Sequence, residues 1–485
     1  MHTRELPLEL APWALFRVLA RKERPFFIDA GRPWGSEWIS SMGFGPRMQF
    51  QVRADAARAA LPALADALAA IAPGRAAAAR PRSVPFAGGA IVALAYETKN
   101  EIERLPQSQR EDTGAPRLVA AIYDAVVAYD HHRGRYVAAS WHLDAAALAR
   151  YADEVMDAAA AAADDGTETS SAAHDADAGS GPSELTTSLD RDAYAARVER
   201  VRAYIAAGDL YQANLSMRLE TPLVGSPLAI YGRLRAAQPV PFGAYLDLGD
   251  AHVLSNSPEL FLRRRGERIE TCPIKGTRHR GRDAATDARL ADELRRDAKE
   301  RAEHIMIVDL ERSDLGRVCR TGSVHVERLA ELATFRTLHH LVTTVRGTLP
   351  REVGIAELLR ATFPGGSITG APKIRAMEII DELERGPRGF YTGALGWIDA
   401  SGDLDLNVAI RTAVAARGRL VYSVGSGIVA DSEAGREHDE CRLKAEAFVR
   451  ALDAESSPRG SIEAPPHDAG AAPARAEHAS ERRAS

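Results

Sequence analysis

The sequence lacks several features by which classes of protein are recognised. Its three cysteines, Cys272, Cys319 and Cys441, are far apart and form no C-x-x-C pair, which argues against a disulfide framework and a structural zinc site. It has no run of about 18 apolar residues and no apolar signal-peptide core near its start, so we expect neither secretion nor a membrane partner. These absences predict a cytoplasmic protein.

A strong excess of one charge is also missing. The 62 Lys and Arg residues against 67 Asp and Glu residues give a net charge of −5, so no general field attracts nucleic acid, which is not an expected partner. Apolar residues are plentiful, at 45% of 485 residues. At about 100–200 residues per domain, the chain can form two or three packed domains, and a wholly disordered protein is excluded.

Two stretches with hardly any large apolar side chain divide the chain. Residues 157–187 are mainly Ala, Asp, Ser, Thr and Gly, and residues 454–485 are similar with several Pro. Such compositions cannot offset the entropy of ordering, so we predict a disordered linker and a disordered tail. The linker separates an N-terminal region, 1–156, from a region at 188–453 that we expect to be the catalytic domain.

Apolar periodicity predicts an α+β architecture. Helices are predicted at 56–71, 194–205, 285–310, 354–361, 372–384 and 435–453. Strands are predicted at 118–129, 212–221, 243–248, 252–255, 260–264, 268–272, 323–327, 341–348, 391–398, 404–414 and 419–424. Because the strands come in runs broken by few helices, the order favours antiparallel sheets over regular βαβ winding.

Lys275 stands between an apolar residue and Gly276, at the end of a predicted strand. Desolvation at such a place lowers the pKa of a lysine and leaves a neutral, nucleophilic amine. A solvated lysine in a surface turn has the same local sequence. The segment alone does not separate the two interpretations.

Two predicted helices each carry a pair of glutamates at a spacing of three residues. Glu300 and Glu303 form one pair, and Glu437 and Glu440 form the other. Four converging carboxylates would repel one another unless a hard cation such as Mg²⁺ held them. Each pair is also compatible with a solvated helix face, and Lys444 is either a cation beside an anionic ligand or the partner of Glu440 in a surface pair.

Two glycine-rich segments are candidates for binding an anion through backbone N–H groups. Residues 363–380 contain a G-x-x-x-x-G spacing but have Ala371-Pro372 where a phosphate loop requires Lys-Ser/Thr, so nucleotide binding is excluded. A helix N-terminus near Pro372 remains possible as a carboxylate site. Gly425 to Ser432 is interpreted as a flexible loop after a strand.

Taken together, these segments resemble one family, the chorismate-utilising enzymes. The matching stretches are GDLYQANLS (208–216), PFGAYLDL (241–248), SNSPELFL (255–262), PIKGTR (273–278), KERAEHIMIVDLERSDLGRV (299–318), HHLVTTVRGTL (339–349), FPGGSITGAPKIRAMEII (363–380), FYTGALGWID (390–399), LNVAIRT (406–412) and GSGIVADS (425–432). The resemblance covers almost all of 190–453. It implies a sandwich of antiparallel sheets with helices on the outside.

Within this family, the residue at position 275 separates the members. Anthranilate synthases have PIAGT there, whereas the PIKGT of this sequence is typical of aminodeoxychorismate synthase component I. Relatives that activate water carry a lysine at the place of Gln212, which disfavours isochorismate and salicylate formation. The resemblance therefore implies conversion of chorismate and ammonia to 4-amino-4-deoxychorismate, for para-aminobenzoate and folate synthesis, with anthranilate synthase component I as the alternative.

The resemblance also implies roles for individual residues. Lys275 would attack ring carbon C2, and Glu259, with a raised pKa, would protonate the departing C4 hydroxyl. Mg²⁺ would be held by Glu303 and Glu440, with Glu300 and Glu437 assisting through waters. The remaining substrate contacts implied are Gln212, Thr277, His340, Thr369, Tyr391, Arg411, Gly425, Gly427 and Lys444. Arg411 is the natural bidentate partner of a carboxylate.

The family also implies partners and a second ligand site. No cysteine has the setting that a glutamine amidotransferase needs, so ammonia is expected from a separate amidotransferase subunit in a heterodimer. Relatives often bind tryptophan in the N-terminal sheets, where Pro241, Phe242 and Gly243 would contribute. Asp29-Ala30 replaces the usual small hydroxyl residue at that site. From another class, a non-catalytic chorismate sensor would keep the fold, but it would not need both Lys275 and Glu259.

Overall fold

The computed structural model describes residues 1–452 apart from 36, 54–55, 57, 73–83, 107–115, 165–184 and 337. The predicted tail, 454–485, and most of the predicted linker lie outside the described residues. The predicted start of the linker at 157 is wrong, because helix α3 (Ala145–Asp164) continues to residue 164. Its alanine-rich end lacks large side chains but has the highest helix propensity.

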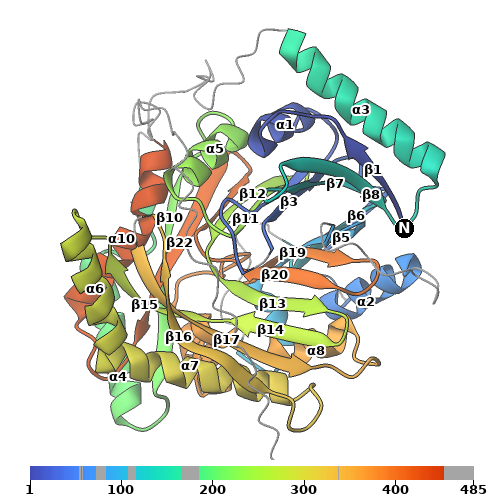
Figure 1. The fold of residues 1–485 in the computed structure, drawn as a ribbon. Coiled ribbons are helices and arrows are strands. Elements are labelled where there is room, and N and C mark those ends of the chain that lie inside the picture. The colour runs from blue at the N-terminus through green and yellow to red at the C-terminus, as the bar shows by residue number, and fades with distance from the viewer. Residues whose placement is uncertain are drawn as a thin grey trace, which may run out of the picture.

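Two large sheets form the centre of the described chain (Figure 1). The first contains, in spatial order, β1 (His2–Leu6), β8 (Arg135–Ser140), β7 (Ala125–Asp130), β3 (Ile39–Gly43), β2 (Phe26–Asp29), β11 (Phe242–Asp247), β12 (Ala251–Ser257), β21 (Thr412–Ala416), β22 (Arg419–Ile428), β10 (Gln212–Pro222) and β18 (Gly370–Ala371), with β9 (Thr186–Thr187) beside β10.

The second sheet contains β15 (Ile274–His279), β17 (Leu338–Thr348), β14 (Arg268–Cys272), β13 (Leu260–Arg265), β20 (Leu404–Val408), β19 (Ala394–Asp399), β5 (Gly89–Leu94), β6 (Leu118–Tyr123) and β4 (Met48–Val52), with β16 (His325–Thr334) beside β17. Neighbouring strands run antiparallel in both sheets. The predicted α+β class with antiparallel sheets is confirmed.

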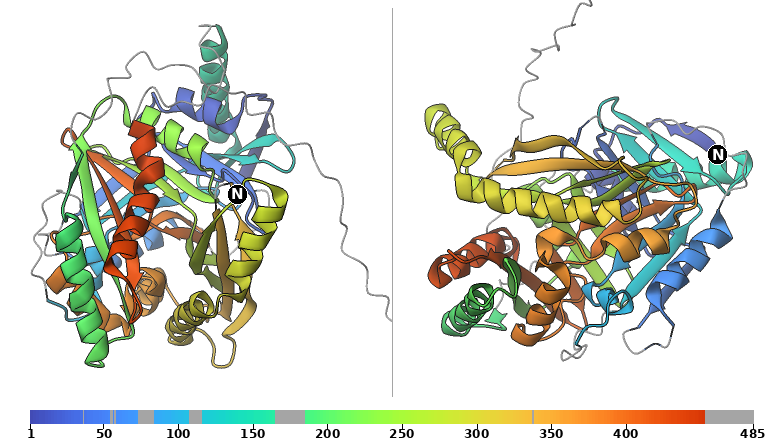
Figure 2. Two further views of the ribbon diagram at one scale, coloured as in Figure 1. Left: turned by 90° about the vertical axis from the view of Figure 1, so that its left-hand side faces the viewer. Right: turned by 90° about the horizontal axis from the view of Figure 1, so that it is seen from below.

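Helices cover the outer faces of the sheets (Figure 2). Those that pack on the first sheet are α1 (Pro12–Leu19), α3, α4 (Arg191–Ala206), α5 (Pro227–Ala237), α9 (Lys373–Leu383) and α10 (Ala434–Leu452). Those associated with the second are α2 (Ala60–Ile71), α6 (Ala284–Arg296), α7 (Ala298–Gly316) and α8 (Ile355–Thr362), and the short 3-10 helices are η1 (Tyr96–Glu101) and η2 (Gly366–Ile368).

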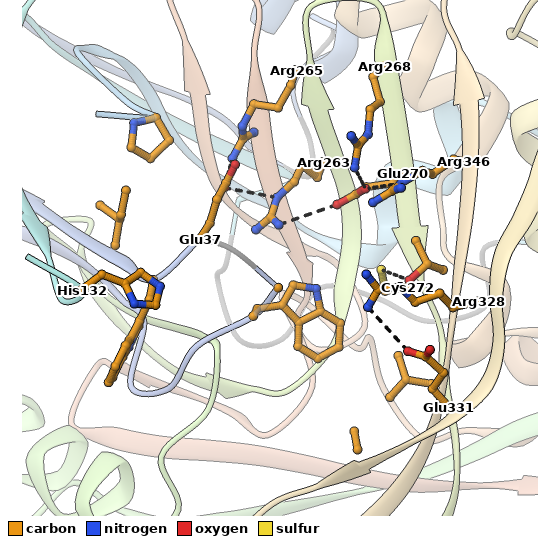
Figure 3. Close-up of a pocket in the computed structure, with 18 of the residues that line it drawn as sticks. Glu37, His132, Arg263, Arg265, Arg268, Glu270, Cys272, Arg328, Glu331 and Arg346 are labelled. Atoms are coloured by element: carbon orange, nitrogen blue, oxygen red, sulfur yellow. Dashed lines mark hydrogen bonds and ion pairs between the residues drawn. The ribbon is translucent and has the colours of Figure 1, made fainter. Parts of the chain in front are cut away.

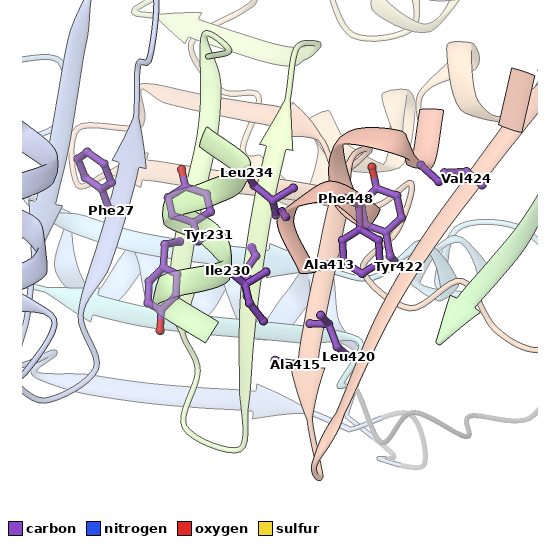
Figure 4. Packing of buried hydrophobic residues seen from close by; sticks show 14 of the residues in the cluster. Phe27, Ile230, Tyr231, Leu234, Ala413, Ala415, Leu420, Tyr422, Val424 and Phe448 are labelled. Atoms are coloured by element: carbon purple, nitrogen blue, oxygen red, sulfur yellow. The ribbon is translucent and has the colours of Figure 1, made fainter. Parts of the chain in front are cut away.

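Aromatic and aliphatic side chains fix these helices to the sheets. Phe448 of α10 stacks on Tyr422 of β22 with ring centroids 4.2 Å apart, and both are buried beside Ala413 (Figure 4). Tyr231 of α5 lies in the same hydrophobic cluster. Burying each large side chain contributes about 1.5–3 kcal/mol, so α10, which carries Glu437 and Glu440, is held firmly in place.

Strands from the N-terminal and C-terminal parts of the chain share both sheets. Strand β2 pairs with β11 in the first sheet, and β5 pairs with β19 in the second. The N-terminal region therefore completes the sandwich, as the resemblance implies.

Several predicted elements are broken where the chain changes sheet. The predicted strand 118–129 is two strands, β6 and β7, in different sheets, and 404–414 likewise contains β20 and the start of β21. The predicted helix 285–310 ends at Asp297, whose side chain accepts the N–H groups of Lys299 and Glu300 and so starts a new helix. The segment from Gly425 to Ile428, interpreted as loop, belongs to β22.

Candidate active site

Lys275 lies near the start of β15, where the pairing with β17 is interrupted by a bulge between Lys275 and Thr277. Gly276, with φ of 73°, takes the left-handed conformation that this bulge needs. The lysine amine reaches β22, since a Cβ added at Gly427 would stand 3.2 Å from the Lys275 Nζ. Gly276 therefore allows the bulge beside Lys275, and Gly427 leaves space for the amine between the sheets.

The surroundings of Lys275 favour a neutral amine. Burial lowers its pKa, and the positive charge of Lys444 lowers it further, while Glu303, Glu259 and Glu440 act in the opposite direction. The amine is therefore flanked by the carboxylates of two distant helices, α7 and α10, and by Glu259. These residues are among the catalytic and metal-binding candidates named from the sequence.

Glu259 lies between β12 and β13 and is 4% exposed. Burial raises its pKa to about 7, although the Ser367 hydroxyl, the Ile274 N–H and Lys275 all oppose the rise. The Ile274 N–H lies 3.4 Å from the Glu259 Oε1. A carboxyl group with this pKa holds its proton for a large part of the time near neutral pH, as a general acid must.

His340 of β17 is held in one tautomer. Its Nδ1 lies 3.1 Å from the Gly276 carbonyl oxygen, which can only accept, so Nδ1 carries the proton, and Thr277 Oγ1 is also 3.1 Å away. Burial lowers the pKa of His340 to about 4, and Arg411 and Lys444 add to this effect. The ring is therefore neutral near pH 7 and its Nε2 is an acceptor.

Two cations lie at the same end of the site. The Lys444 Nζ donates to the Gly425 carbonyl at 2.8 Å and pairs with Glu440 at 2.6 Å. Arg411, with φ of 52°, follows β20, and its charge acts on both His340 and Glu440. Within the described ranges the Arg411 guanidinium forms no ion pair, which leaves it available to a carboxylate.

Three buried polar residues complete the predicted set. Gln212 is fully buried, and neither atom of its amide has a partner among the described residues. Thr369 is also fully buried and donates to the Gly365 carbonyl at 3.0 Å. Tyr391 is 6% exposed, and burial raises its pKa. An unpaired buried amide costs about 1–3 kcal/mol, so Gln212 indicates a place for a ligand.

The four predicted metal ligands lie near one another but not in a closed cage. Glu303 has a raised pKa through burial, and the charges of Glu300 and Glu437 contribute to the rise. Glu300 pairs with Arg278 at 3.0 Å, and Glu440 with Lys444. No group of three or more His, Cys, Asp or Glu side chains in the described part of the chain is arranged to hold a metal ion. The oxygen-only donor set and the repulsion at Glu303 nevertheless suit a hard cation.

Pro241, Phe242 and Gly243 line a different cavity, of about 50 Å³, together with Ala30 and Trp34. The Trp34 and Phe242 rings meet edge to face with centroids 5.3 Å apart. Asp29 points the other way and pairs with Arg235 at 2.6 Å. The structure does not bring this group to Lys275.

A much larger cavity, of about 1000 Å³, lies in front of β13, β14 and β17 (Figure 3), and no sequence pattern indicated it. Six arginines contribute to its lining, and each has a carboxylate partner: Arg133 with Asp130, Arg263 and Arg265 with Asp405, Arg268 and Arg346 with Glu270, and Arg328 with Glu331. We call it the arginine cavity. None of the predicted catalytic, metal or substrate residues lines it.

A family model described as chorismate binding enzyme matches residues 23–450. The chain belongs to this family. It is 41% identical over 377 residues to anthranilate synthase component 1 of Streptomyces coelicolor, covering 76% of this chain and 73% of the relative. It is 38% identical over 373 residues to aminodeoxychorismate synthase component 1 of Bacillus subtilis, covering 76% and 77%.

A solved structure, that of anthranilate synthase component I from Streptococcus pneumoniae, superposes with a TM-score of 0.74 at 29% identity, over 86% of this chain and 93% of the other. The protein is therefore a chorismate-utilising enzyme. Relatives with two different activities match it about equally well, so its own product has to be argued from the site. No helix among the described residues has the length and apolar character that crossing a membrane requires.

Proposed function

We propose that this protein is aminodeoxychorismate synthase component I, which converts chorismate and ammonia to 4-amino-4-deoxychorismate. The observation that carries the proposal is the Lys275 amine, which has a lowered pKa and lies between Glu259 and the carboxylates of α7 and α10. An alanine at this position, as the resemblance attributes to anthranilate synthases, would provide no nucleophile. The relatives named aminodeoxychorismate synthase component 1 add support.

The chemistry needs a nucleophile and an acid on the same ring. The neutral Lys275 amine forms a bond to C2, the two ring double bonds shift, and the C4 hydroxyl leaves as water with the proton of Glu259. Ammonia then bonds to C4, the double bonds shift back, and the C2–nitrogen bond to Lys275 breaks. The Glu259 carboxylate recovers a proton from the incoming ammonia, so the acid is restored at the end of the cycle.

The negative charges of the two chorismate carboxylates would be neutralised by cationic side chains of this chain and by a metal ion. We assign Arg411 and Lys444 to the chorismate carboxylates, because both are positively charged and lie beside His340. Mg²⁺ would be held by Glu303 and Glu440, with Glu300 and Glu437 nearby, and would neutralise the ring carboxylate. Removal of divalent cations with EDTA is expected to abolish turnover and to weaken chorismate binding measured by calorimetry, and added Mg²⁺ is expected to restore both.

The same proposal names the partner and the setting. Ammonia would come from a glutamine amidotransferase subunit, in keeping with relatives that are named as component 1. The product would supply para-aminobenzoate and folate synthesis in the cytoplasm.

Product analysis tests the proposal. Purified protein is incubated with chorismate, Mg²⁺ and an ammonium salt, and the products are separated while released pyruvate is measured with lactate dehydrogenase. Aminodeoxychorismate keeps its enolpyruvyl group, so we expect an aminated product without pyruvate. Anthranilate with an equal amount of pyruvate would instead show an anthranilate synthase, and chorismate binding without turnover would show a sensor.

A further inference from the structure

Arg388, which lies after α9, is a buried cation outside the predicted site. Its side chain is 3% exposed and forms two hydrogen bonds with Glu384, at 2.8 and 2.6 Å. Glu384 also accepts the Ser216 N–H at 2.8 Å. Since a single carboxylate neutralises the guanidinium, the remaining donors of Arg388 are free to serve other groups.

Those donors bind the backbone of two chain segments. One terminal nitrogen donates to the Ile368 carbonyl at 3.0 Å, and the other donates to the Asn214 carbonyl at 2.8 Å. The Asn214 N–H in turn donates to the Thr369 carbonyl at 2.7 Å. The guanidinium thus joins the turn that carries Thr369 to the strand that begins at Gln212.

A third segment follows Arg388 itself. The Tyr391 N–H donates to the Arg388 carbonyl at 3.2 Å, and the guanidinium also reaches the Thr392 hydroxyl at 3.3 Å. Thr392 has φ of 60°, a conformation that β-branched residues rarely adopt and that needs support from its surroundings. One side chain therefore contacts the turn around Tyr391 as well.

Two residues of the N-terminal part of the chain, Tyr96 and Glu97, also contact Arg388. Glu97 accepts the N–H groups of Arg388 and Gly389 at 2.8 and 3.1 Å, and the Tyr96 ring centroid lies 4.6 Å from the guanidinium. The Tyr96 N–H donates to the Gly389 carbonyl at 2.8 Å. Helix η1 thereby connects the first hundred residues to the turn that carries Tyr391.

We propose that Arg388 is a positioning residue of the reaction, which sets Thr369 and Tyr391 in register with Gln212 so that the three contact chorismate together. The inference rests on the proposed function, because it takes these three residues as substrate contacts. The Arg388 guanidinium donates to the carbonyl oxygens of Asn214 and Ile368 and to the hydroxyl of Thr392, so it contacts three chain segments. A lysine has one nitrogen and cannot span them, whereas the planar guanidinium can.

A double-mutant cycle between Arg388→Lys and Thr369→Ala tests the proposal. We expect Arg388→Lys to lower kcat/KM for chorismate by about 10–100-fold, since small displacements of contact groups cost up to about 10²-fold. In the Thr369→Ala background, the same substitution is expected to cost clearly less than in the wild type, because one of the two contacts that it displaces is already absent. Equal losses in both backgrounds would overturn the proposal.

Arg263→Lys is the matched control. Arg263 is also a buried arginine, with two hydrogen bonds to Asp405 at 2.9 and 2.8 Å, but it binds none of the three segments. We expect it to lower the melting temperature while kcat/KM stays within about twofold. If Arg263→Lys reduces kcat/KM as much as Arg388→Lys, Arg388 has only a structural role.

Two further measurements keep the test decisive. If Arg388→Lys does not fold, Glu97→Gln takes its place in the cycle; it removes the carboxylate that receives two backbone N–H groups and is expected to cost about 3–10-fold in kcat/KM. Chorismate affinity is measured by calorimetry alongside turnover, and the same non-additivity is expected there. A wild-type protein that forms anthranilate would overturn the proposed product, while the cycle would still report on Arg388.

Discussion

The Lys275 site and the arginine cavity are both rich in charge, yet they differ in how that charge is satisfied. In the arginine cavity each arginine has a carboxylate partner. Burial acts to raise the pKa of Glu270, but Arg263, Arg346 and Arg268 hold that pKa below its usual value. Around Lys275 the reverse holds. Burial lowers the pKa of the lysine and raises that of Glu259 to about 7.

The difference shows which feature marks a reactive site. The arginine cavity is large, but its arginines are paired with carboxylates, and these pairs connect strands of the fold. Burial raises the pKa of Glu259 and lowers that of Lys275, in each case against the charged form, and the Gln212 amide has no partner among the described residues. Shifts of this kind are typical of functional sites.

The largest contrast is expected from removing one side chain in each region. Lys275→Ala should lower aminodeoxychorismate formation by at least about 10³-fold, because the nucleophile is lost. Lys275→Arg should be as inactive, since a guanidinium stays protonated. Arg268→Ala, in the arginine cavity, should leave ammonia-dependent kcat/KM within about twofold. Steady-state kinetics with chorismate and ammonium salt measure all three, and near-normal activity of Lys275→Ala would remove the assigned role of the lysine.

The pH dependence sharpens the comparison further. In the proposed reaction Glu259 acts as a proton donor, so kcat/KM should fall as pH rises through about 7. In the same proposed reaction Lys275 acts as a neutral amine, so protonation of this amine should lower kcat/KM on the acid side. Glu259→Gln should lower kcat/KM by about 10²–10⁴-fold and abolish the basic limb, while Arg268→Ala should keep the wild-type profile. A profile of Glu259→Gln that still falls near pH 7 would assign that limb to another group.

Stability should change in opposite directions in the two regions. The folded state raises the pKa of Glu259, so folding loses stability as pH rises from about 4.5 to 7, and Glu259→Gln should be more stable than wild type by about 1–3 kcal/mol at pH 8. This gain should vanish towards pH 5.

Arg346→Met, by contrast, should lose about 1–3 kcal/mol at neutral pH, because it removes the 2.9 Å pair with buried Glu270. Since the pKa of Glu270 is lowered in the folded state, its contribution is present above the unfolded pKa and is lost as pH falls below about 4.5. Urea unfolding at pH 5 and pH 8 measures both variants, and a stabilised Arg346→Met would contradict the contrast.

The smallest effect is expected at Gly427. A Cβ there would lie 3.0 Å from the Gln212 Nε2 and 3.2 Å from the Lys275 Nζ, and both side chains can yield slightly. Gly427→Ala should therefore lower kcat/KM by about 3–10-fold. Gly316→Ala is the control, because a Cβ there meets no atom of the described residues within 4 Å. Equal kinetics of the two variants would show that the amine is not close to Gly427 during turnover.

Predictions of single helices and strands from local patterns agree with the structure. Predictions of where the chain passes from one sheet to the other do not. Periodicity located β10 and α10, and the segment around Lys275 was found because an apolar strand, a lysine and a glycine are contiguous. The run 118–129 conceals a change of sheet at Asp124, because both halves are buried and apolar. Gly425 belongs to β22 rather than to a loop, and a glycine fits there because the neighbouring strand leaves no room for a side chain: a Cβ would stand 2.6 Å from the Asn214 Oδ1.

Residues that act across long sequence distances leave no local signal. Arg388 lies 174 positions from Asn214 and 291 from Glu97, so no spacing rule connects them. The arginine cavity likewise depends on side chains from β13, β14, β16 and the segment around Trp34. Glu311, in the stretch 299–318, is buried and accepts the Gly366 N–H at 2.8 Å. Its position in the predicted helix does not indicate this contact with a distant segment.

The most direct test is the mass of the protein after incubation with chorismate and Mg²⁺ without any source of ammonia. We predict that rapid acid quenching traps a species heavier by chorismate minus one water, and that peptide mapping places it on Lys275. An unmodified protein under conditions in which chorismate is bound, or an adduct on another residue, would contradict the covalent role of Lys275.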